Sequence, residues 1–217
     1  MTDATSDAEV VPLQLLPLAA VVNRATLVLH GGLFRKPHKR KRGRQGRRPH
    51  EDEPLELGSL DDLRNGNTGG RDPDGTGASI LATDVLWSDP MRADGLKLNH
   101  ARGVGLLFGP DATQRFLEHN SLRLIVRSHE GPDSRIKNKR MEQMSAGFTE
   151  DHAGTHGKLV TVFSAANYPM YLPDGEDRCS NSAAFLTLSG PAFCEPVVTS
   201  FGAAQRPEGK CYYDTSG

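Results

Sequence analysis

Short apolar segments, separated by stretches rich in glycine, proline and acidic residues, limit the fold of this chain more than any other feature. Five segments of this kind are rich in β-branched and aromatic side chains: residues 25–30, 122–129, 158–165, 183–188 and 197–201. Such short runs are typical of β-strands. The sequence contains 23 glycines and 14 prolines among 217 residues, so turns are frequent and long helices are not expected. It therefore predicts one mixed α/β (α+β) domain.

Three short helices are predicted between and before these strands. Residues 15–22 are apolar and begin near a proline, which favours a short helix packed on the core. In residues 58–63, Ser59 is suited to cap a helix and Asp62 stands three positions later, where it completes a capping box. A clearer helix is predicted to begin at Pro110 and to end at Asn120.

We expect the domain to span residues 10–203, with a long insertion loop at 35–80. The polar residues 1–9 are expected to be a disordered N-terminus, and residues 204–217 a flexible tail. The acidic start does not resemble a secretion signal. No apolar run approaches the roughly 18–20 residues of a membrane span, so no membrane partner is expected. The three dispersed cysteines are typical of a reducing compartment, which predicts the nucleus or the cytoplasm.

The region between residues 35 and 48 carries nine basic residues and no acidic one, although the whole chain has a net charge of −1. The basic residues are Arg35, Lys36, Lys39, Arg40, Lys41, Arg42, Arg44, Arg47 and Arg48. Glycines and prolines among them favour an exposed, disordered loop. Three interpretations remain open: a solvated insertion, a nuclear-localisation signal read by an import receptor (Lys39 to Arg48), and a patch that binds nucleic acid.

Two histidines directly follow predicted strands. His30 ends the segment 25–30 before two glycines, and His129 ends the segment 122–129. Ligands gather at the carboxyl ends of sheet strands, and neutral imidazole binds divalent metals. Taken alone, a histidine at the end of a strand more often makes a structural hydrogen bond. The other six lack metal-ligand spacing and are interpreted as surface residues: His38, His50, His100, His119, His152 and His156.

Five sequence blocks then follow one another in a recognisable order. They are LHGGLF (29–34), DVLWSDP (84–90), ARGVGLLFGPD (101–111), LRLIVRSHEGPD (122–133) and KLVTVFSAANY (158–168). Together they resemble the metal-dependent serine/threonine phosphoprotein phosphatases, and most of all the plant type-seven branch. The resemblance runs from about residue 15 to residue 201. It implies the carboxyl-terminal half of a calcineurin-like metallophosphoesterase β-sandwich flanked by helices.

The resemblance assigns roles to five residues. His30 and His129 are similar to the ligands of one of the family's two catalytic metals. Arg102 resembles the guanidinium that grips the substrate phosphate, for which its planar fork is suited. Tyr168 resembles a tyrosine that borders the phosphate site, and Asp89 a carboxylate near it. The aromatic side chains of Trp87, Phe108 and Phe163 are interpreted simply as core.

The family's activity is the hydrolysis of phosphoserine and phosphothreonine in phosphoprotein substrates. Its cofactors are two divalent ions (manganese, iron or zinc), which lower the pKa of a bridging water so that it attacks phosphorus. Three family blocks that supply further metal ligands, GDxHG, GDxVDRG and GNHE, do not occur in this sequence. We therefore expect a truncated phosphatase, a phosphoric monoester hydrolase by resemblance, whose incomplete metal site leaves the chain inactive by itself.

Overall fold

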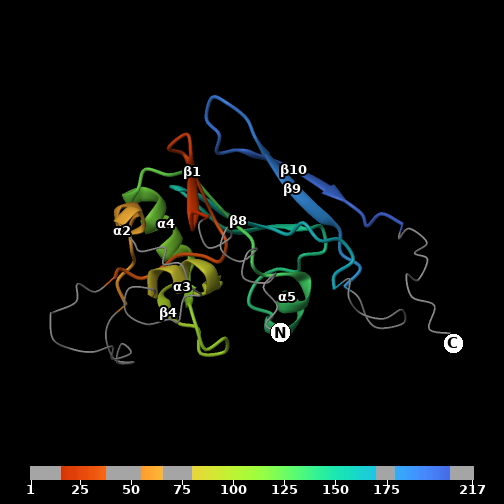
Figure 1. Cartoon of the computed structure of the whole chain (residues 1–217), viewed down its shortest axis with the longest axis horizontal. Helices are drawn as coiled ribbons and strands as arrows, with labels where there is room; N and C mark the ends of the chain where they lie inside the picture. The colour runs from red at the N-terminus through yellow and green to blue at the C-terminus, as the bar shows by residue number, and fades with distance from the viewer. Residues whose placement is uncertain (1–15, 38–54, 66–79, 170–178, 206–217) are drawn as a thin grey trace, which may run out of the picture.

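The computed structural model describes residues 16–37, 55–65, 80–169 and 179–205 (Figure 1). The expectations for residues 1–9, for the basic residues from Lys39 to Arg48 and for most of the tail lie outside these ranges. Within them, no helix has both the length and the apolar composition needed to cross a membrane.

A five-stranded sheet forms the centre of the fold, in the order β1-β2-β6-β8-β7. Its strands are β1 (Ala19–Val22), β2 (Thr26–Leu29), β6 (Leu124–Arg127), β7 (Phe148–Gly154) and β8 (Gly157–Val162). The three central strands β2, β6 and β8 run parallel, and the outer strands β1 and β7 pair antiparallel to their neighbours. The carboxyl ends of the three parallel strands therefore meet at one edge of the sheet.

The prediction of a helix over residues 15–22 is wrong, because residues 19–22 form strand β1 and residues 16–18 are not helical. Three residues, Asn23 to Ala25, join β1 to β2. Asn23 and Arg24 have positive φ angles of 48° and 56°, and the Ala25 amide donates to the Val22 carbonyl oxygen over 3.0 Å. Two consecutive residues of this kind make the turn that suits the right-handed twist of a hairpin. Asparagine tolerates such angles better than most residues, and hydrogen bonding to β2 then prevails over the helical tendency of the segment.

Two smaller sheets and four helices complete the described fold. A three-stranded sheet contains β3 (Asp89–Pro90), β5 (Leu106–Phe108) and β4 (Leu96–Leu98), and a separate hairpin contains β9 (Ala183–Leu188) and β10 (Pro196–Phe201). The helices are α2 (Leu60–Asn65), α3 (Ile80–Trp87), α4 (Pro110–His119) and α5 (Pro132–Asn138). The predicted capping box of α2 is present: Ser59 Oγ lies 2.7 Å from Asp62 Oδ2, and Asp62 N donates back to Ser59 Oγ.

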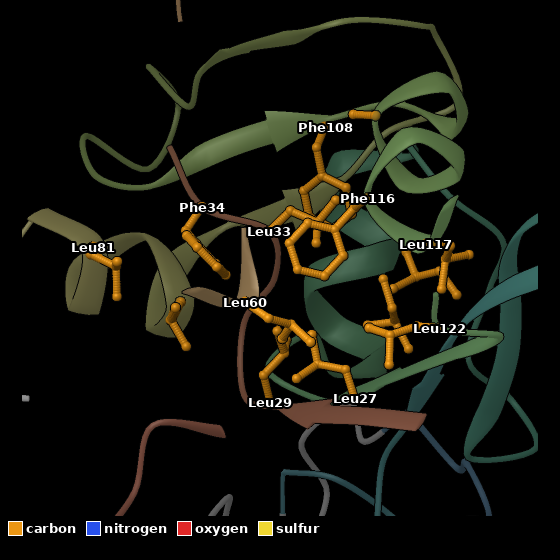
Figure 2. Packing of buried hydrophobic residues seen from close by; sticks show 14 residues of the cluster. Leu27, Leu29, Leu33, Phe34, Leu60, Leu81, Phe108, Phe116, Leu117 and Leu122 are labelled. Atoms are coloured by element: carbon orange, nitrogen blue, oxygen red, sulfur yellow. The ribbon is translucent and has the colours of Figure 1, made fainter. Parts of the chain in front are cut away.

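Apolar side chains fix helices to one face of the central sheet. Figure 2 shows Leu27 and Leu29 of β2 beside Leu60 of α2 and the aromatic pair Phe34 and Phe116. The two rings meet edge to face with centroids 5.8 Å apart. Helices α2, α3 and α4 thus share one core with the sheet.

A second apolar cluster lies on the other side of the sheet. Leu124 and Val126 of β6 and Val160 of β8 are buried there, and Leu186 and Leu188 of β9 pack against them. The hairpin β9–β10 therefore forms a second β-layer, and Figure 1 shows it reaching past the central sheet. The mixed α/β prediction is confirmed, as a sheet with helices on one face and a hairpin on the other.

The described residues within the 35–80 range are packed, unlike the insertion loop expected there. The Arg35 guanidinium is buried and forms two hydrogen bonds with the Asp84 carboxylate, of 2.7 and 2.8 Å. Arg35 also pairs with Leu57 in a β-bridge, and Leu60 of α2 belongs to the core. A buried cation requires a partner, and Asp84 on α3 supplies it, so Arg35 does not belong to an exposed basic loop.

Candidate active site

Three of the predicted site residues follow the three parallel strands at the same edge of the sheet. His30 comes directly after β2, His129 two residues after β6, and Tyr168 follows β8 along the chain. The connection between the first two is tight, since Ser128 N donates a hydrogen bond of 3.0 Å to the His30 carbonyl oxygen. His30 and His129 are 99 positions apart in the sequence, and the parallel pairing of β2 and β6 brings them into contact.

The two glycines after His30 allow a close approach to the end of helix α3 and to the Phe108 ring on β5. A Cβ atom at Gly31 would lie 2.5 Å from the backbone carbonyl of Leu86, and one at Gly32 would lie 2.3 Å from the ring of Phe108. No side chain fits in that space. The amide of Gly31 donates to the Val85 carbonyl oxygen over 2.8 Å, so the glycines bring His30 beside the strand that carries Asp89.

The imidazoles of His30 and His129 face each other through one nitrogen each. His30 Nε2 and His129 Nδ1 are 3.1 Å apart, and the ring centroids are 5.0 Å apart. Burial, together with the Arg127 charge, lowers the pKa of His30. Burial lowers the pKa of His129 to about 3, although Asp89 opposes the shift. Both rings are therefore neutral near pH 7, the form in which imidazole ligates a metal.

The spacing of these nitrogens fits two neighbouring ligands of one divalent ion. Nitrogens that each lie about 2.0–2.1 Å from an ion are separated by about 2.8–3.4 Å when they occupy adjacent coordination positions, from octahedral to tetrahedral. The 3.1 Å between His30 Nε2 and His129 Nδ1 lies in this range. Among the described residues, however, no group of three or more histidine, cysteine or acidic side chains could hold a metal. The described ranges therefore contribute two imidazoles toward such a site.

A carboxylate and a guanidinium lie beside the imidazole pair. Asp89 Oδ2 accepts hydrogen bonds from Arg102 Nε (2.9 Å) and Asn99 Nδ2 (3.0 Å). Asp89 Oδ1 lies 3.9 Å from His129 Nε2. The Trp87 ring stands edge-on to the His129 ring at 5.3 Å and lies 5.9 Å from the Arg102 guanidinium carbon. The buried Asp89 carboxylate thus orients the Arg102 guanidinium, and about a quarter of the Arg102 side chain remains exposed to solvent.

Arg127, at the end of β6, connects all three segments that carry these residues. Its guanidinium is fully buried and donates to the main-chain carbonyl oxygens of Gly31 and Ser88. It also reaches the carboxylates of Asp89 at 3.3 Å and Glu130 at 2.9 Å. One side chain therefore holds the backbone after His30, the strand of Asp89 and the loop of His129 in a single arrangement.

The ionic network continues from Arg127 to helix α5. Arg135 on α5 donates to both carboxylate oxygens of Asp151, over 2.7 and 2.8 Å, and to Glu130 over 3.2 Å. These side chains are essentially inaccessible to solvent. The neighbouring Arg135 and Thr161 hold the pKa of Asp151 below its usual range despite its burial. Alternating charges thus satisfy one another and fix α5 against β7 and β8.

A pocket of about 380 Å³ opens next to Arg102 and His129. The Phe163 and Tyr168 rings, perpendicular to each other with centroids 5.2 Å apart, form one wall. The backbone amide of Tyr168 is held by a hydrogen bond of 3.0 Å to Asn181 Oδ1. The remaining lining residues are Asp89, Asn99, Ala101, Gly131, Asp133, Ser134, Lys137, Asn138 and Arg140. The pocket therefore joins the candidate phosphate residues to the polar side of α5.

Three interpretations of single residues are wrong, and two residues of the site were not singled out from the sequence. Phe163 is not core: it is half-buried and lines the pocket beside Tyr168. Trp87 is not core: it is 39% exposed and touches His129 and Arg102. His152 is not on the surface: it is buried, with hydrogen bonds to Thr113 Oγ1 and the Met91 carbonyl oxygen. Arg127 and Asn99 were missed. The sequence does contain a signal for Arg127: it is the one charged residue in the otherwise apolar strand β6. A buried cation implies carboxylate partners.

Comparisons with known proteins place the chain among phosphoesterases. The family model described as "Calcineurin-like phosphoesterase" matches residues 6–133. The chain is 42% identical to "Serine/threonine-protein phosphatase 7" of Arabidopsis thaliana, over 92% of this chain and 50% of that protein. It is 34% identical to "Serine/threonine-protein phosphatase 5" of Homo sapiens, over 90% of this chain and 30% of that protein. The chain thus spans half or less of the length of these relatives.

A solved structure shares the fold. It is a protein serine/threonine phosphatase from Saccharomyces cerevisiae with similarity to human phosphatase PP5. The TM-score is 0.61 at 27% sequence identity, and the match covers 95% of this chain and 53% of the yeast chain. The expected calcineurin-like fold is therefore confirmed, as is the resemblance to the serine/threonine phosphatases and their plant type-seven branch.

Proposed function

Because the chain belongs to the calcineurin-like phosphoesterase family, we propose that it carries the phosphate-binding part of a serine/threonine protein phosphatase site. One observation supports this most directly. His30, His129 and Arg102 come from three separate segments of the sequence, yet they form one cluster at the carboxyl edge of the sheet: Arg102 and His129 lie beside the Asp89 carboxylate, and His30 contacts His129. The substrates are phosphoserine and phosphothreonine in proteins, as the names of the relatives suggest.

In this proposal, His30 Nε2 and His129 Nδ1 are ligands of one divalent ion. When such ions (manganese, iron or zinc) are bound, they supply an activated water and polarise the phosphoryl oxygens. Ligation through Nδ1 leaves the His129 proton on Nε2, which is buried without a hydrogen-bond partner in the described structure and faces Asp89 at 3.9 Å. The carboxylate attracts a proton at that atom, and so it favours the tautomer that ligation requires.

Arg102 binds the phosphate in this proposal. Its Nε and Nη2 atoms both lie 2.9 Å from Asp89 Oδ2. Among the described residues, no acceptor engages its Nη1 group, which leaves donor capacity for a phosphate oxygen. Asp89 and Trp87 therefore act by positioning the guanidinium, and Tyr168 closes the far side of the pocket. A planar, oriented cation of this kind is suited to phosphate recognition.

We also propose that the 217-residue chain by itself does not turn over substrate, because two imidazoles cannot hold a dinuclear centre. The test has two parts. With added Mn²⁺, the chain should release no measurable phosphate from a phosphoserine peptide, and robust release that His129→Ala abolishes would refute this part. Joined to the portion of the Arabidopsis relative that the match leaves uncovered, the chain should regain turnover.

The phosphate-binding role is tested separately by fluorescence anisotropy in EDTA. A labelled phosphoserine peptide should bind the chain more tightly than its unphosphorylated form, and Arg102→Ala should remove that difference. Arg115→Ala is the matched control, since Arg115 is an exposed arginine on α4 whose ion pair within the described residues is with Asp111, across one helical turn. An equal loss in both variants would contradict the assignment of Arg102.

A second candidate function rests on the basic residues between 36 and 48, most of which lie outside the described ranges. Their density of charge supports nuclear import or binding of nucleic acid, and with it a nuclear location. Arg35 is excluded from this role because it is buried against Asp84. Deletion of residues 38–48 should abolish salt-sensitive RNA or DNA binding and nuclear accumulation. Binding that is insensitive to salt, with unchanged localisation after deletion, would contradict the candidate.

A further inference from the structure

We propose that the pocket beside Arg102 also binds a second anionic group of the substrate, and that Lys137 and Arg140 bind it. The proposed phosphatase site would then prefer phosphorylated residues whose neighbour in the peptide carries a carboxylate or another phosphate. This inference rests on the proposed function and adds a substrate class to it. Its basis is the shape, the charge and the anchoring of the wall that α5 contributes.

The pocket is larger than one phosphorylated side chain requires. Its volume of about 380 Å³ falls in the range of roughly 300–1,000 Å³ in which proteins bind ligands of many atoms. Arg102, His129 and Tyr168 line one part of it, and Ser134, Lys137 and Arg140 line another. A phosphoryl group held by Arg102 therefore leaves room for an adjacent side chain to reach the wall formed by α5.

Within the described residues, the charge on that wall has no ion-pair partner. Of the two acidic residues that line the pocket, Asp89 is already paired with Arg102 and Arg127. Only Asp133 remains to oppose Lys137 and Arg140, and neither cation lies within ion-pair distance of a carboxylate in the described structure. Five other cations in the described structure do have such partners: Lys36–Glu56, Arg64–Asp61, Arg92–Glu142, Arg115–Asp111 and Lys158–Glu150. The pocket therefore presents positive charge to an incoming peptide.

The backbone that carries the two cations is firmly held. Helix α5 begins directly after the loop of His129, and its Arg135 is buried in the ion pairs with Asp151 and Glu130. The helix ends at Lys139, whose left-handed conformation (φ 49°) turns the chain. After this turn Arg140 lines the pocket, whereas the exposed Lys139 does not. Two cations of this segment are thus directed at the pocket, and the one between them provides a natural control.

Peptide binding tests the inference. Three labelled phosphoserine peptides that differ at one neighbouring position (glutamate, a second phosphoserine or glutamine) are compared by anisotropy, with EDTA present and at low salt. The chain should bind the glutamate and diphosphorylated peptides about 3- to 10-fold more tightly than the glutamine peptide, as two partly exposed charge pairs allow. The tighter of the two identifies the preferred anion. The double variant Lys137→Ala/Arg140→Ala should lose the preference, and Lys139→Ala should retain it.

The outcomes separate this inference from the proposed function. If all three peptides bind equally, or if the double variant weakens all three by the same factor, the second anionic subsite is refuted while phosphate binding by Arg102 stands. If no phosphorylated peptide binds better than its unphosphorylated form, the proposed function fails, and the inference fails with it. Because Lys137 is exposed and Arg140 half-buried without ion pairs in the described structure, their replacement should not prevent folding, which a circular dichroism spectrum verifies.

Discussion

Replacement of Arg127 by methionine should destabilise the fold by about 3–5 kcal/mol, the usual effect of breaking a buried ion pair. The side chain is fully buried and serves two carboxylates, Asp89 and Glu130, and two main-chain carbonyl groups. The effect is not doubled, since Arg102 stays on Asp89 and Arg135 stays on Glu130. Even so, the loss is a large part of the roughly 5–15 kcal/mol that stabilises a typical domain.

Urea unfolding, followed by circular dichroism and by the fluorescence of the single tryptophan, measures this loss. Arg64→Met is the control, because the Arg64–Asp61 pair is exposed on both sides and such pairs contribute at most about 1 kcal/mol. The reasoning predicts a large difference between the two variants. If Arg127→Met unfolds within about 1 kcal/mol of the parent, the network is not what holds the site segments together.

Three further perturbations test other parts of the structure. Gly31→Ala should destabilise the chain by about 1–3 kcal/mol in urea unfolding and weaken phosphopeptide binding. The reason is that the new Cβ atom would lie 2.5 Å from the Leu86 backbone. Wild-type stability of this variant would show that the close approach is absent. Ser59→Ala should cost about 0.5–2 kcal/mol in the same assay through loss of the α2 cap, and an unchanged midpoint would contradict the capping box. Burial lowers the pKa of His152 in the folded chain. Below about pH 6.5, the unfolded chain therefore binds a proton at His152 that the folded chain does not bind. Stability should therefore fall between pH 7.5 and 5.5, and less steeply in His152→Gln; identical pH dependence would refute that role.

Local patterns were enough to predict much of the sheet. The β-branched runs that become β2, β6, β8, β9 and β10 are short and bounded by turn residues, and the structure places strands within or beside all five. Helix α4 begins at Pro110, as expected, and Asn120 caps its end. In these segments, propensity and tertiary packing favour the same structure, so the sequence alone is informative.

The errors occur where residues outside the segment itself decide its structure. Segment 19–22 has no strong strand pattern, and it becomes β1 because β2 offers it hydrogen bonds across a tight turn. Arg35 was assigned to an exposed basic run, but Asp84, 49 positions away, makes its burial favourable. The role of Arg127 likewise depends on Asp89, 38 positions away. No local window contains both partners of such a pair.

The candidate site was predictable as a set of residues and not as an arrangement. Family resemblance singled out His30, Asp89, Arg102, His129 and Tyr168 from the motifs that contain them. The contact of Trp87 with the His129 and Arg102 side chains became visible only in three dimensions. So did the pocket formed with α5, because a short helix with mixed charges has no pattern that indicates a binding wall.

The central claim is that His30 and His129 offer their facing nitrogens to one ion, and a titration of the histidine ¹⁵N resonances with Zn²⁺ tests it most directly. The signals of His30 Nε2 and His129 Nδ1 should shift together along one saturation curve, while the buried, hydrogen-bonded His152 remains unmoved. His30→Ala should remove the response of His129. Separate midpoints for the two histidines, or an unchanged His129 response in that variant, would contradict a shared metal.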